Sequence, residues 1–125
     1  MPLSDQERKN IRETWRIKVE KDREIETYRK KEAFDRVYKI AKILKEKYFV
    51  DKVILYGSLA RDDRFDNLSD IDIFIDGWDD SKFNYWTMLI DVENVAKPYK
   101  ISIVTQKEAY KSLLNEILRE GRIIE

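Results

Sequence analysis

Residues 53–58, VILYGS, and residues 70–76, DIDIFID, are the most informative parts of the sequence for the fold. The first is an apolar, β-branched run that a glycine and a serine interrupt, as expected at the end of a short buried strand. The second has isoleucine at every second position and a glycine directly after it, the pattern of a half-buried strand. The two runs therefore predict two strands joined by residues 59–69, as a short helix or loop.

Asp70 and Asp72 are expected to share one face of the second strand, because successive side chains point to opposite faces. Two carboxylates spaced about 6–7 Å along a strand can reach one metal ion or a pair of ions. Aspartate is a poor strand residue and like charges on one face repel, so the pair favours a bound cation. The alternative is a solvated sheet face that has aspartates only for solubility, and the two residues alone do not decide between them.

Gly57 and Ser58 favour a bound cation at the two aspartates over a merely solvated sheet face. A strand that ends in Gly-Ser exposes backbone N–H groups to phosphate oxygens, and a helix N-terminus there adds a favourable dipole. Many Gly-Ser pairs are ordinary turns, but this one follows a buried strand and precedes the aspartate strand. The combination indicates a site for a phosphorylated ligand and a metal ion.

The rest of the chain predicts helices around these strands. Apolar residues at helical spacing indicate helices over about 4–29 and 31–48, either separate or continuous, with Ser4 as the N-cap. Ser81 is the expected N-cap of a helix that ends before Pro98, residues 100–105 form a third strand, and a capping box at 105–108 opens a last helix that Gly121 closes. The fold class is α/β (α+β), a small mixed sheet packed against helices, with an extra N-terminal helix.

Composition limits the chemistry. The 125 residues contain neither Cys nor His, so a metal ion must bind oxygen ligands, which points to Mg²⁺ or Mn²⁺. Residues 1–50 have 15 basic and 10 acidic side chains and residues 51–125 have 10 and 15, an acidic balance that fits a phosphate site only if carboxylates hold cations. Since there is no signal peptide or membrane-spanning apolar run, the expected compartment is the cytoplasm.

Three motifs together resemble a known family. GSLAR at residues 57–61, LSDID at 68–72 and NEILREG at 115–121 are similar to the minimal nucleotidyltransferase (MNT) branch of the polymerase-β-like nucleotidyltransferase superfamily. The resemblance covers about residues 34–125, and the first thirty residues match nothing in it. We therefore expect an N-terminal helical extension at 1–30 and a nucleotidyltransferase domain at 31–125.

The resemblance implies roles for individual residues. Asp70 and Asp72 would be catalytic and would ligate the metal. Nucleotide binding would fall to four residues of the first two motifs: Gly57, Ser58, Arg61 and Ser69. Guanidinium groups suit phosphate, although Arg61, like the less favoured Arg64, could equally be surface charge.

Ser102 is where the chain departs from the family pattern. The family has a third catalytic carboxylate on the next core strand, and the matching position here is Ser102. A serine hydroxyl is a poor metal ligand and no base at neutral pH, so transfer should be slow or absent unless another carboxylate substitutes. Asp76 and Asp91 are the candidates that the sequence offers.

Two functions follow from the resemblance. The first is transfer of a nucleoside monophosphate, AMP, from ATP to a hydroxyl group of a partner protein, as the antitoxin of a pair with a helical HEPN-type toxin. The second is a catalytically weak or inactive nucleotide-binding module that regulates a HEPN-type partner by contact. The N-terminal helix could also form a homo-oligomer. Nucleic acid is not the expected ligand, because that helix interleaves acids with bases.

Overall fold

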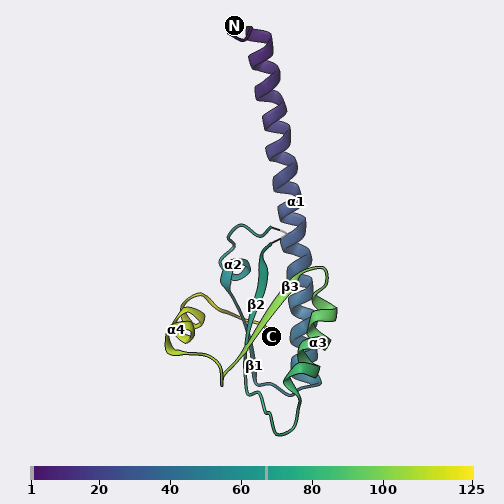
Figure 1. The fold of residues 1–125 in the computed structure, drawn as a ribbon, viewed down its shortest axis with the longest axis vertical. Helices are drawn as coiled ribbons and strands as arrows, with labels where there is room; N and C mark the ends of the chain where they lie inside the picture. The colour runs from purple at the N-terminus through teal and green to yellow at the C-terminus, as the bar shows by residue number, and fades with distance from the viewer. Residues whose placement is uncertain (1, 67) are drawn as a thin grey trace.

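The computed structural model describes residues 2–66 and 68–125, so Met1 of the expected extension and Asn67 of the connection lie outside the described residues. Figure 1 shows a small body from which one long helix projects. The elements are, in chain order, α1 (Asp5–Glu46), β1 (Lys52–Tyr56), α2 (Gly57–Ala60), β2 (Asp70–Asp76), α3 (Tyr85–Ala96), β3 (Lys100–Thr105), α4 (Lys111–Glu120) and β4 (Arg122–Ile123).

The four strands form one mixed sheet in the order β3-β2-β1-β4. β2 runs antiparallel to β1 and parallel to β3, and α3 connects the two parallel strands. Parallel neighbours require such a crossover connection. The predicted fold class, a small mixed sheet with helices and an additional N-terminal helix, is confirmed.

The N-terminal part of the chain is one continuous helix, α1. It begins after Ser4, whose hydroxyl accepts a hydrogen bond from the Glu7 amide at 3.1 Å, as the capping pattern predicts. Its buried residues lie between Ala33 and Leu44, and the part before them extends away from the body (Figure 1). The boundary expected between residues 30 and 31 thus falls inside this helix, and the division into two domains remains a prediction.

Two apolar clusters lie on the two faces of the sheet. α1 and α3 cover one face, where the three isoleucines of β2 are fully buried. On the other face Ile117 of α4 packs with Phe74 of β2, and Figure 1 shows α4 on the opposite side of the sheet from α1 and α3. Asp72 is half-buried and Asp70 exposed on this second face, so the aspartates lie at the edge of the area that α4 covers.

The helix expected after Ser81 begins later than predicted. The Asn84 side chain accepts hydrogen bonds from the amides of Trp86 at 2.9 Å and Thr87 at 3.1 Å and so caps α3. Ser81 instead bonds to Asp79 in a preceding turn. The prediction of Ser81 as the cap was wrong because its hydroxyl has a nearer local partner.

The capping box at residues 105–108 also forms a turn. The amides of Glu108 and of the following Ala109 bond to the Thr105 carbonyl, and α4 begins only at Lys111 after Tyr110. The prediction that this box opens the last helix was therefore wrong. Gly121 ends α4 as predicted. The chain then pairs with β1 as β4, a strand too short to leave a sequence pattern.

No helix among the described residues combines the length and the apolar composition that a bilayer-spanning segment requires.

Candidate active site

Asp72 lies at the centre of a row that crosses three strands. Its register partner on β1 is Tyr56 and its partner on β3 is Ser102. Adjacent strands are about 4.8 Å apart, so the Asp72 and Ser102 side chains are neighbours on one face. Asp70 follows on the same face, opposite Lys100. Ser102 therefore occupies the place beside the aspartate pair at which the family pattern has a carboxylate.

Gly57 lies directly against the Asp72 carboxylate. The chain leaves β1 and turns at Gly57 with φ +75°, a conformation that side-chain-bearing residues rarely adopt. A Cβ atom at this position would lie 2.3 Å from Asp72 Oδ2, so the approach is possible only for glycine. Ser58 follows as the second residue of α2 and is half-buried. The structure thus brings the Gly-Ser turn and the aspartate strand together at one point.

The electrostatic surroundings of Asp72 disfavour its charged form. Burial is the main cause that raises the pKa of Asp72 to about 6, and the negative charges of Asp70 and Glu116 add to it, whereas Arg61 acts in the opposite direction. A raised carboxyl pKa of this origin means that the ionised form is less stable here than in water, mainly because it is partly removed from solvent. Such perturbed groups occur at functional sites, although structural networks also produce them.

Arg61 reaches the same region from α2. Its amide bonds to the Gly57 carbonyl at 3.1 Å, so the two residues lie one helical turn apart in the segment. Arg61 Nε lies 2.8 Å from Asp63 Oδ2, and Nη1 lies 2.9 Å from Glu120 Oε2. These contacts raise the pKa of Arg61 and lower that of Glu120. Arg61, which is predicted to bind phosphate, is thus paired with carboxylates of the loop and of α4.

Ser69 shapes the turn that enters β2. Its hydroxyl donates a hydrogen bond to Asp66 Oδ1 at 3.2 Å and accepts one from the Asp66 amide at 3.1 Å. The Leu68 amide also bonds to Asp66 Oδ1, at 2.9 Å, and these bonds lower the pKa of Asp66. Ser69 therefore orders the residues before Asp70, and a direct contact to nucleotide remains a prediction.

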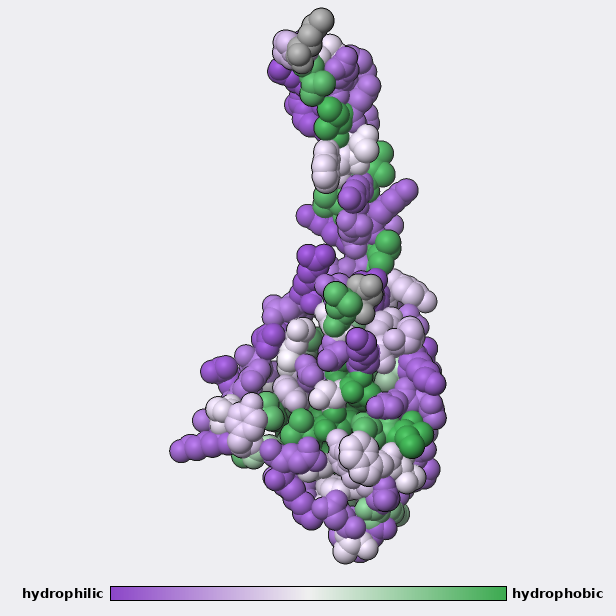
Figure 2. Space-filling model, viewed as in Figure 1, coloured by the Kyte–Doolittle hydropathy of each residue, from purple (hydrophilic) through white to green (hydrophobic). Residues whose placement is uncertain are grey.

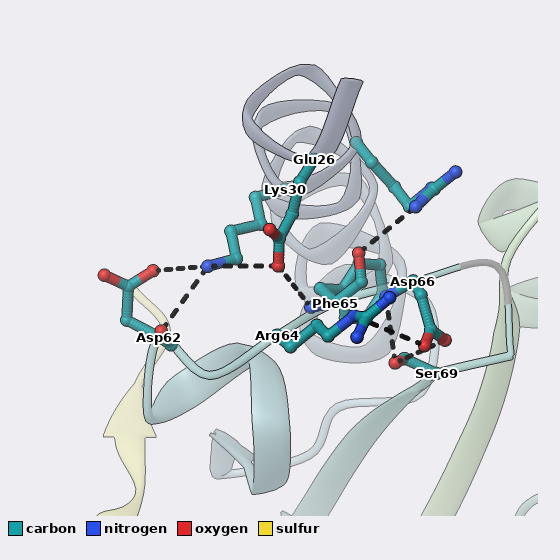
Figure 3. A network of polar contacts seen from close by, with 8 residues as sticks. Glu26, Lys30, Asp62, Arg64, Phe65, Asp66 and Ser69 are labelled. Atoms are coloured by element: carbon teal, nitrogen blue, oxygen red, sulfur yellow. Dashed lines mark hydrogen bonds and ion pairs between the residues drawn. The ribbon is translucent and has the colours of Figure 1, made fainter. Parts of the chain in front are cut away.

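Side chains of α1 hold the connection between α2 and β2, as Figure 3 shows. The Phe65 amide donates to Glu26 Oε1 at 3.0 Å, and the Phe65 carbonyl accepts from Arg29 at 3.4 Å. Lys30 pairs with Asp62 at 3.1 Å. Since the Phe65 side chain is fully buried, α1 fixes this connection at the point where the helix leaves the body.

Neither carboxylate proposed as a substitute for Ser102 lies next to Asp72. Asp91 is on α3, over the opposite face of the sheet, where it bonds to Lys47 and Tyr48. Asp76 is four residues from Asp72 along β2, which is about 13 Å, and it accepts a hydrogen bond from the following amide. Asp91 and Asp76 are therefore excluded as the third carboxylate within one chain.

The donor set fits a magnesium ion that binds together with phosphate. In the described part of the chain no three His, Cys, Asp or Glu side chains are grouped as a complete metal site. Mg²⁺, however, commonly binds one or two carboxylates and takes its remaining ligands from water and substrate phosphates. Asp70 and Asp72, on one face of β2 beside the Gly57 turn, meet that requirement.

Several residues of this site were not predicted from the sequence. Tyr56 could have been placed there, because strand alternation puts it on the Asp72 face, and burial raises its pKa to about 12. On α4, Glu120 contacts the site through its hydrogen bond to Arg61, whereas Glu116, one turn earlier on the same side of the helix, makes no hydrogen bond to a described residue of the site. Which side faces the sheet depends on the packing of Ile117 against Phe74, which the sequence does not reveal.

Comparison with known proteins agrees with this geometry. Residues 38–125 match the family model described as polymerase beta, nucleotidyltransferase. The chain therefore belongs to the polymerase beta nucleotidyltransferase family, as the sequence motifs predict.

The relatives are similar over the same part of the chain. "Putative protein adenylyltransferase MJ1217" of Methanocaldococcus jannaschii is 32% identical over 85 residues, which are 66% of this chain and 83% of the relative. A crystal structure of a mutant of the toxin–antitoxin MntA–HpeT has a TM-score of 0.56 at 20% identity and covers 70% of each chain. A crystal structure of a toxin–antitoxin with AMP-PNP has a TM-score of 0.55 at 19% identity, covering 69% of this chain and 70% of that one. At such identities the two structures support the fold alone.

Proposed function

We propose that the protein transfers AMP from ATP to a hydroxyl group of a partner protein. The hydroxyl oxygen attacks the α-phosphorus, the bond from that phosphorus to the bridging oxygen breaks, pyrophosphate leaves, and the hydroxyl proton passes to water. The observation that carries the proposal is the contact of the Gly57 turn with the Asp72 carboxylate, with Asp70 next on the same face. Membership of the family supports the class of reaction, and the description of the archaeal relative supports adenylyl as the group transferred.

Each site residue has a role in this proposal. Asp70 and Asp72 would hold Mg²⁺ or Mn²⁺, and the ion would supply positive charge that neutralises the triphosphate and the pyrophosphate that leaves. Gly57 and Ser58 offer amide N–H groups and a hydroxyl to the phosphates. Arg61 contributes a guanidinium group from the next turn of the same segment. Ser69, which orders the chain before Asp70, completes the nucleotide-binding set.

A second candidate function rests on Ser102. The register partner of Asp72 is a hydroxyl group instead of a carboxylate, and an absent general base costs about 10²–10⁴-fold in rate. With two aspartates still able to hold one metal ion, the chain would bind nucleotide and transfer slowly or not at all. In that form it regulates its partner by contact.

The partner in both candidates is a HEPN-type helical toxin, and the projecting half of α1 is a surface for a partner or a second copy of the chain. Ile11, Trp15 and Val19 recur every four residues there and are 44%, 60% and 44% exposed. Figure 2 shows hydrophobic side chains between hydrophilic ones along this part of the helix. A helix with such a stripe gains stability when another helix covers it.

The experiment that tests the proposal uses α-labelled ATP, Mg²⁺ or Mn²⁺, and the product of the adjacent gene. Label on the partner protein together with pyrophosphate release supports the transferase, and Asp70→Asn with Asp72→Asn should remove both. Nucleotide binding without label selects the binding module. Absence of metal-dependent binding as well as label would contradict both candidates.

A further inference from the structure

The Arg61 guanidinium is held from two directions. Its Nε atom bonds to Asp63 of the loop and its Nη1 atom to Glu120 of α4, at 2.8 and 2.9 Å. Its Nη2 atom has no hydrogen-bond acceptor among residues 2–66 and 68–125. Because a guanidinium is planar and its N–H groups point in fixed directions, these two bonds determine where the Nη2 donors point.

Glu120 is itself in a fixed position. It is the last residue of α4, and its side chain is only 19% exposed. The next residue, Gly121, packs so tightly that a Cβ atom there would lie 2.5 Å from Ile54 Cγ2 of β1. β4 then pairs with the same strand, so the end of α4 is attached to the strand that leads into the Gly57 turn.

We propose that Glu120 is a positioning residue for the nucleotide, which orients Arg61 so that its Nη2 group donates to the phosphates bound at the Gly57 turn. The inference rests on the proposed nucleotide site and adds a residue to it. Arg61 lies one turn after Gly57, with its amide bonded to the Gly57 carbonyl at 3.1 Å, and the Gly57 turn is the point of the segment that lies against the Asp72 carboxylate.

A positioning role and a purely electrostatic role of Glu120 predict opposite effects of its removal on triphosphate binding. Glu120 and Asp63 already neutralise Arg61, and Glu116 lies 3.7 Å from its Nη1 atom. If Glu120 acted only through its negative charge, its removal would strengthen the binding of an anionic triphosphate. If Glu120 orients a directional donor, its removal weakens that binding, because the freed guanidinium samples other orientations.

The test measures the dissociation constants of MgATP and of magnesium tripolyphosphate by calorimetry. Glu120→Ala should weaken both about tenfold, the range for one charge-assisted hydrogen bond. Glu120→Gln keeps an acceptor oxygen in the same place and should recover part of the loss. Glu116→Gln is the matched control, since it removes a carboxylate one turn earlier on α4 that makes no hydrogen bond to Arg61, and its binding should be equal to wild type or tighter.

A double-mutant cycle separates positioning from a structural effect. If Glu120 acts through Arg61, then Glu120→Ala should have no further effect in an Arg61→Ala background. Binding by Glu120→Ala that is equal to or tighter than that of the wild type would overturn the positioning role. So would a loss of affinity on Glu120→Ala that is just as large when Arg61 is already alanine. In both cases, binding of the two ligands by the wild type would still support the proposed nucleotide site. A wild-type protein that binds neither ligand would overturn the proposed nucleotide site and, with it, this inference.

Discussion

Ser102 on β3 is the parallel register partner of Asp72 on β2. The hydroxyl therefore stands beside the carboxylate that also touches the Gly57 turn. The next residue after Asp72 on the same face of β2 is Phe74, so β2 places no third carboxylate directly beside the aspartate pair. A carboxylate introduced at position 102 would therefore lie beside Asp72 and could act as the third acidic residue of the metal site.

Ser102→Asp should strengthen metal binding and raise the rate of transfer, by up to about 10²–10⁴-fold if the missing base limits the reaction. Without metal the variant should be less stable than wild type, because it adds a third negative charge next to Asp70 and Asp72. Titration with Mn²⁺ and chemical unfolding with and without metal measure both effects, and Ser102→Asn is the uncharged control. Rapid transfer by the wild type would contradict the expectation that Ser102 impairs the site, and would point to a carboxylate from a second subunit.

The stability of the metal-free protein should depend on the ionisation of Asp72. In the unfolded chain this carboxyl titrates near its usual pKa of 3.8, whereas in the folded protein its pKa is about 6. The folded protein favours the protonated form of Asp72. The stability that this protonation contributes is therefore fully present below the unfolded pKa and is lost as the pH rises through about 6. Asp72→Asn should be more stable than wild type above pH 6 and should lack this decline.

Urea unfolding between pH 4.5 and 7.5 in the presence of EDTA measures the effect. Other carboxyls, such as that of Glu120, have lowered pKa values and change stability with pH in the opposite direction. The readout is therefore the difference in the free energy of unfolding between wild type and Asp72→Asn. Parallel curves for the two proteins would show that Asp72 is not buried near negative charge.

Gly57→Ala should abolish nucleotide binding and destabilise the fold by about 1–3 kcal/mol, the cost of a strained backbone conformation. The new methyl group would collide with Asp72 Oδ2 and displace the carboxylate. Gly77→Ala is a matched control, because Gly77 has φ +86° and its Cβ would lie 2.4 Å from Asp51 Oδ2, away from Asp72. The control should lose similar stability but keep its affinity for MgATP, and equal binding by the two variants would contradict the role of Gly57.

Removal of the projecting part of α1 should leave the body folded. A deletion of residues 1–22 spares Glu26, Arg29 and Lys30, which hold the loop before β2. The truncated protein should unfold cooperatively but show a lower oligomeric state or weaker partner binding by light scattering. Trp15→Glu in the full chain should have the same effect. Loss of cooperative unfolding after the deletion would show that this segment belongs to the core.

The sequence was sufficient to predict β1, β2, β3 and the Gly-Ser turn after β1, because strand alternation and glycine conformation are local properties, whereas β4 was not predicted. It also placed Ser102 on the correct face. It did not reveal the start of α3, since Asn84 and Ser81 are both plausible caps and only the local partner Asp79 distinguishes them. The contacts of Arg61 with Glu120 depend on how α4 packs, and 59 residues separate the two in the chain.

The most direct test of the account is calorimetric titration of MgATP into the wild type and into Asp70→Asn/Asp72→Asn. Both aspartates lie on the side of the sheet away from the α1–α3 core, so the double variant should remain folded, as circular dichroism and cooperative unfolding can confirm. We expect metal-dependent ATP binding by the wild type and no such binding by the double variant. Equal binding by the two proteins would show that the nucleotide site is not at Asp70 and Asp72.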